Sequence, residues 1–138
     1  MRPLLALLLA CAACASGSAR GLLRIELPPM ESGFGTAAER DLASAVEGAA
    51  AAEGLTCQPG AGAELLHCAP ASLGSQSRGV VVDLMRSGTG YEVSIEQVLR
   101  IGRGSPVCAM QKRIADRIPL AMGPAVVHVD TRSDCPGE

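Results

Sequence analysis

Cysteine and histidine are the residues of this chain with the widest range of chemistry, and it holds six cysteines and two histidines. Beyond residue 19 the cysteines are Cys57, Cys68, Cys108 and Cys135. In an exported protein, cysteines at such spacings form disulfides. Zinc binding is the alternative, but these four cysteines form no CxxC pair, and His67 lies directly beside Cys68. We therefore expect disulfides and no metal site.

Four cysteines allow three pairings, and topology selects among them. Cys57 and Cys68 lie at similar distances from a glycine-rich turn, on the two arms of a predicted hairpin. Cys108 falls in the first turn of a predicted helix, and the strand after that helix returns Cys135 towards the helix start. We expect the bridges Cys57–Cys68 and Cys108–Cys135.

A Ser/His/Asp set could be drawn from Ser94, His128 and Asp83. No nucleophile elbow or metalloprotease motif marks these residues, and a chain of this size offers such a trio by chance. A histidine such as His67 or His128 in a strand is usually a packed or surface residue. We therefore expect no catalytic residues and no enzyme activity.

Residues 33–38, Gly-Phe-Gly-Thr-Ala-Ala, partly resemble the glycine-rich fingerprint of dinucleotide-binding folds. That motif needs a tight strand-to-helix turn and an acidic residue at the end of a second strand. Here Pro28 and Pro29 separate the strand from the turn, and Glu53 falls at a helix end. We expect a capped surface turn and no cofactor.

Composition limits the partners. The chain has 138 residues and a net charge of −2, and its arginines are scattered without a basic run. Nucleic-acid binding needs clustered basic residues, ideally beside stacking aromatics, and only Phe34 and Tyr91 are aromatic. We expect no nucleic-acid partner.

The N-terminus has the pattern of a secretory signal peptide over residues 1–19: one basic residue, a short apolar run and then small residues. Within it, Leu8-Leu9-Ala10-Cys11 resembles the lipobox of bacterial lipoproteins, although Leu9 stands where a small residue is usual. The resemblance implies a lipid-modified Cys11. Cleavage after Ala15 or Ala19 by an ordinary signal peptidase is the alternative. Both alternatives predict export. A lipid-modified protein would be held in the cell envelope or periplasm by a membrane anchor, and a protein cleaved by an ordinary signal peptidase would be freely secreted.

The elements that must position these residues centre on a hairpin over Gly79–Val98. Its first arm is β-branched and apolar. Its second arm alternates apolar residues with Glu92, Ser94 and Glu96, which is typical of a strand with one face in water. Two glycines in the link, Gly88 and Gly90, supply positive φ.

The rest of the chain divides at proline and glycine. A strand over 23–27 is followed by a helix with a capping box of Thr36 and Glu39, which ends at Gly54. A strand pair over 55–68 precedes the central hairpin. A helix from Ser105 to Pro119 and a strand over 125–130 follow it.

This order predicts an α+β fold, a two-layer sandwich with a mostly antiparallel sheet and two helices on one face (β-α-β-β-β-β-α-β). Residues 20–138 would form a single disulfide-stapled domain. The predicted function is a small non-catalytic module of the envelope or of the secreted fraction that binds a macromolecule or has a structural role. A small inhibitor of a secreted enzyme, acting through a loop at 69–78 or 100–104, is the alternative, and an enzyme is a weaker one.

Overall fold

The computed structural model describes residues 20–27, 35–71, 79–97, 107–123 and 128–133, with side chains up to residue 123. The elements follow the predicted order: β1 (Arg20–Glu26), α1 (Ala37–Ala52), β2 (Leu55–Pro59), β3 (Glu64–Pro70), β4 (Val80–Ser87), β5 (Gly90–Gln97), α2 (Val107–Met122) and β6 (His128–Ser133).

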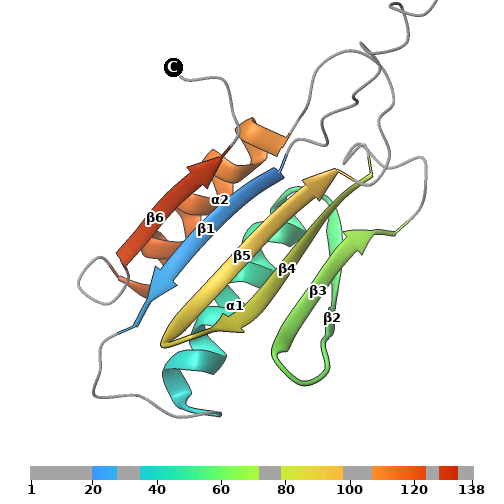
Figure 1. Ribbon diagram of the computed structural model, residues 1–138. Helices are drawn as coiled ribbons and strands as arrows, with labels where there is room; N and C mark the ends of the chain where they lie inside the picture. Colours follow the sequence, from blue (N-terminus) through green and yellow to red (C-terminus); the bar gives the residue numbers. More distant parts are fainter. Residues whose placement is uncertain (1–19, 28–34, 72–78, 98–106, 124–127, 134–138) are drawn as a thin grey trace, which may run out of the picture.

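The strands form one six-stranded sheet in the order β2-β3-β4-β5-β1-β6, and all neighbours are antiparallel. Both helices lie behind the sheet in Figure 1, with α2 behind β6 and β1 and with α1 behind β5 and β4. This confirms the predicted α+β two-layer fold. We call the other face of the sheet, which neither helix covers, the open face.

The core lies between the helices and the sheet because each element turns its apolar residues towards that space. The central strands contribute alternating residues such as Leu84 and Val93, which are fully buried and lie opposite each other. Leu42 of α1 and Ile114 of α2 cover them and are also fully buried. These large aliphatic side chains supply the buried apolar area that aromatic residues supply in other cores.

The central hairpin is confirmed, with two corrections. Gly88 alone of the two linking glycines has positive φ, at 60°. Gly90 is required for space instead, because a Cβ there would lie 2.8 Å from the carbonyl oxygen of Ile25. Ser94, expected in water, is only 7 % exposed. It lies on a central strand, opposite Asp83 and Leu22, so larger neighbouring side chains surround it.

The helix ends follow their capping residues. Thr36 is the N-cap of α1, with its Oγ1 accepting from the Glu39 N–H at 3.2 Å, and Gly54 follows the C-cap with φ of 82°. In the sequence, Pro119 predicts that the second helix ends or kinks there, and the helix continues to Met122. Proline has no N–H for the carbonyl four residues earlier, but its own carbonyl still accepts from the Gly123 N–H at 2.7 Å and closes the last turn.

The predicted Cys57–Cys68 disulfide is present. The two residues are direct cross-strand partners in β2 and β3, which places their side chains on the same face. Cys108, in the first turn of α2, is also disulfide-bonded. Its predicted partner, Cys135, lies outside the described residues.

Candidate functional site

The structure does not assemble the Ser/His/Asp set that the sequence allowed. Asp83 and Ser94 are cross-strand partners, but His128 lies on β6, with β5 and β1 between it and β4. Three strand spacings amount to roughly 14 Å. By register His128 lies beside Glu26 instead.

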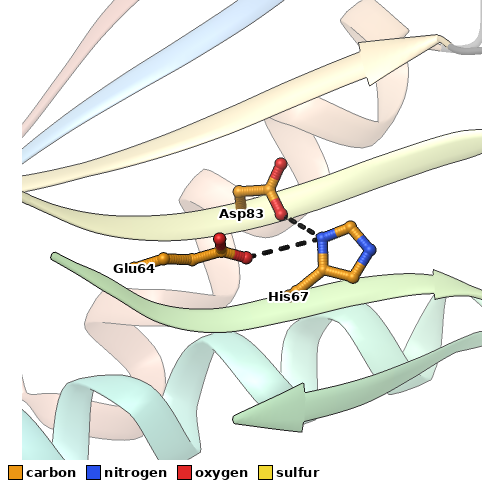
Figure 2. A group of neighbouring side chains, drawn as sticks. All are labelled: Glu64, His67 and Asp83. Atoms are coloured by element: carbon orange, nitrogen blue, oxygen red, sulfur yellow. Dashed lines mark hydrogen bonds and ion pairs between the residues drawn. The ribbon is translucent and has the colours of Figure 1, made fainter. Parts of the chain in front are cut away.

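Asp83 contacts the other histidine. His67 of β3 and Asp83 of β4 are direct cross-strand partners, and their side chains meet on the open face, with Nδ1 and Oδ1 2.5 Å apart. Glu64 joins them, with its Oε1 3.6 Å from the same Nδ1. Figure 2 shows both contacts ending at one nitrogen of the imidazole ring. We call Glu64, His67 and Asp83 the open-face cluster.

A β-bulge puts Glu64 into the cluster. In a regular strand, residues three apart point to opposite faces, so Glu64 and His67 would be separated by the sheet. Here Glu64 pairs with Met85 while Leu66 pairs with Leu84, so β3 advances two residues where β4 advances one. The extra residue reverses the alternation, which brings the Glu64 carboxylate to the face that carries His67.

The order of residues across the strands decides what chemistry this cluster can perform. A hydrolytic triad needs its histidine between the nucleophile and the acid. On the open face the order is His67, Asp83, Ser94, with the acid in the middle. The side chains of Glu64, His67 and Asp83 are partly exposed, at 36 %, 46 % and 24 %. The arrangement is suited to binding an ion at the surface, because the three residues each offer one potential ligand atom and these atoms lie within 4.8 Å of one another.

A second acidic cluster lies on the covered face, at the start of α1. Glu39 is 5 % exposed, and its carboxylate accepts from the Gly35 N–H, the Tyr91 hydroxyl, and both Nε and Nη2 of Arg86. Arg86 and Tyr91 are cross-strand partners in β4 and β5. We call Glu39, Arg86 and Tyr91 the inner cluster, and it ties α1 to the sheet.

Hydrogen bonding governs the protonation of the inner cluster. The hydrogen bonds from Arg86, and a weaker contribution from Tyr91, lower the pKa of Glu39 from 4.5 to about 2 against the opposing effect of burial. Burial, together with the hydrogen bond to Glu39, raises the pKa of Tyr91 to about 12. At neutral pH the cluster therefore holds an ionised carboxylate, a guanidinium and a neutral phenol. The predicted capping box is half right: Thr36 caps the helix, but the Glu39 carboxylate reaches Gly35 and the sheet.

A further acidic residue on the covered face, Glu53, joins the two helices at the C-cap of α1. It accepts from Arg113 at 2.6 and 2.8 Å and from Arg117 at 3.0 Å, both of α2. The hydrogen bonds from Arg113 lower the pKa of Glu53. This contact orients one helix against the other on the covered face.

Sequence reasoning missed the open-face cluster. The sequence suggests Asp83 as a partner of His128, and it presents His67 mainly as a neighbour of Cys68. The available signal was Asp83 itself, a charged residue inside the apolar run of β4. A charged residue on a central strand usually has a polar partner on an adjacent strand. The lipidation candidate Cys11 and the loop at 100–104 lie outside the described residues, as does most of the loop at 69–78.

Neither helix of the described part of the chain is long and apolar enough to span a membrane. No protein-family model matches this chain, and neither does any curated protein or solved structure.

Proposed function

We propose that this chain is an exported, non-catalytic module of the cell envelope or the secreted fraction, and that it binds another protein through its open face. The observation that carries the proposal is the asymmetry of the sheet. Both helices cover one face (Figure 1), and by register the strands place polar and charged residues such as Arg24, Asp83 and Glu92 on the other. The Cys57–Cys68 disulfide supports export, because such bridges persist in oxidising compartments.

The charges of the open face favour a protein partner over a polyanion. Arg20 and Arg24 of β1 lie directly opposite Glu96 and Glu92 of β5, so these charges are balanced across the strands. Asp83 adds a further acidic residue on β4. A nucleic acid or an anionic membrane would meet a face that is neutral to acidic, whereas a protein surface with charges of both signs can complement it.

Site-specific photo-crosslinking in the native host tests this proposal. Met85 lies on the open face and is 39 % exposed, and Leu120 lies on α2 and is 84 % exposed. We expect a photoreactive amino acid at position 85 to give a discrete crosslinked protein, and the same probe at position 120 to give none. Purified wild-type protein should compete the product away, and an E92R variant should not.

The control position makes the result decisive. Products of equal yield at positions 85 and 120 would indicate unspecific contact, and a product at position 120 alone would place the interface on the helices. Either result would contradict the open-face proposal. Mass spectrometry of the mature N-terminus tests export separately: a lipid-modified Cys11 or a start near Ser16 or Arg20 supports it, and a retained Met1 contradicts it.

A further inference from the structure

The open-face cluster has more acceptors than donors. An imidazole carries at most one proton on Nδ1, so this nitrogen can donate to one acceptor well. Two carboxylates, from Asp83 and Glu64, approach this one nitrogen at 2.5 and 3.6 Å. A single proton at Nδ1 therefore leaves two negative charges close together with only partial compensation. A divalent cation in place of that proton would bind all three groups at once.

We propose that Glu64, His67 and Asp83 bind a divalent transition-metal ion of the Zn²⁺ type. Two carboxylates balance the charge of the ion, and the imidazole nitrogen selects the class of metal. Mg²⁺ and Ca²⁺ prefer oxygen ligands alone, whereas Zn²⁺ and its neighbours in the first transition row accept imidazole together with carboxylate. Water would complete the coordination, because the three side chains are open to solvent.

The three ligand atoms lie within 4.8 Å of one another, so binding a metal ion requires an adjustment of the side chains. Zn–N and Zn–O bonds of about 2.0–2.1 Å place neighbouring ligand atoms roughly 3–3.4 Å apart. The 3.6 Å between Nδ1 and the Glu64 oxygen is close to this range, while the 2.5 Å between Nδ1 and the Asp83 oxygen must widen. The His67 side chain is 46 % exposed, so its ring can rotate outwards without disturbing the core.

The backbone beneath the cluster supports a preformed site. Asp83 lies on β4, in the interior of the sheet, and His67 lies on β3 beside Cys68, whose disulfide joins β3 to β2. The bulge in β3 brings Glu64 to the same face. Ligands on paired strands keep their spacing better than ligands on loops. This inference is independent of the proposed protein partner and concerns the purified chain alone.

Zinc titration of the mature, untagged, oxidised protein tests the proposal, after treatment with a chelator and by isothermal calorimetry. We expect one Zn²⁺ per chain. The variants H67Q, D83N and E64Q should each lower the affinity, by at least about tenfold, since even outer-shell changes commonly cost 10–100-fold. The matched control is H128Q, which removes the other histidine and should leave the affinity unchanged. Mg²⁺ and Ca²⁺ at equal concentration should not compete.

A direct measurement on the wild-type protein avoids any effect of the variants on folding. Because the chain has two histidines, ¹⁵N–¹H spectra of the imidazole rings can follow each one. We expect the His67 nitrogens to shift on addition of Zn²⁺ and those of His128 to stay in place. The proposal is overturned if His128 responds as His67 does, or if H67Q alone weakens binding while both carboxylate variants bind normally. Equal competition by Ca²⁺ would also overturn it.

Discussion

Strand β4 carries a charged cluster on each face of the sheet, and the two differ in how completely their charges are matched. On the covered face, Arg86 gives two hydrogen bonds to Glu39, and Tyr91 and the Gly35 N–H give two more. On the open face, Asp83 and Glu64 share one imidazole nitrogen.

This difference separates structure from binding. A buried carboxylate has to be satisfied within the protein, since water cannot reach it, and Glu39 is. The carboxylates of the open-face cluster are in contact with water, so folding does not require protein partners for them. The inner cluster therefore contributes to the stability of the fold. The open-face cluster is left able to bind a ligand.

The largest expected effect comes from breaking the inner cluster. Arg86→Met keeps the length of the side chain but leaves the Glu39 carboxylate buried without its cation. Removing one partner of a buried pair costs about 3–5 kcal/mol. Urea denaturation at pH 7 measures this loss. Arg40→Met is the matched control, because Arg40 is exposed and bonds the Gly35 carbonyl at 3.0 Å. Equal losses in both variants would contradict a special role for the inner cluster.

Acid should weaken the same contact. The pKa of Glu39 is lowered in the folded state, so the ionised carboxylate stabilises the fold fully above its ordinary pKa of 4.5. That stabilisation is lost as the pH falls through 4.5 towards about 2. A shift of this size corresponds to roughly 3 kcal/mol. We expect the free energy of unfolding of the wild type to fall by that much more than that of Glu39→Gln between pH 5 and 2. Parallel pH profiles of the two proteins would contradict the prediction.

The sequence could predict contacts between residues that are close along the chain or related by one turn, but not the contacts within either cluster. The Thr36–Glu39 pair is local, and the distance of Cys57 and Cys68 from one turn determines their contact. The order of elements follows from local signals of the same kind, at proline, glycine and alternating strands. For this reason the fold class could be derived without knowledge of any tertiary contact.

Contacts between distant residues depend on register, which the sequence does not state. The connection between β3 and β4 can be closed in several registers, and only one of them puts His67 opposite Asp83. The bulge in β3 then reverses the side of Glu64, against the usual alternation of a strand. In the same way, nothing near Glu39 indicates that Arg86, 47 residues later, faces it.

The smallest expected effect comes from the open-face cluster without metal. Asp83→Asn removes one of two carboxylates that compete for the same ring nitrogen, and it keeps the shape of the side chain. The loss of an exposed ion pair and the relief of repulsion between Asp83 and Glu64 oppose each other. Exposed ion pairs contribute about 0–1 kcal/mol, so we expect a net change in the free energy of unfolding within about 0.5 kcal/mol.

Urea denaturation in the presence of a chelator measures this change, with Asp41→Asn on the exposed side of α1 as the matched control. A loss well above 1 kcal/mol for Asp83→Asn alone would mean that the His67–Asp83 contact supports the fold as Arg86–Glu39 does. The two faces of β4 would then be alike, and the binding role of the open-face cluster would lose its physical basis. If both substitutions have the same small effect, Asp83 is free to act as a ligand, because its contact with His67 can open at little cost to the fold.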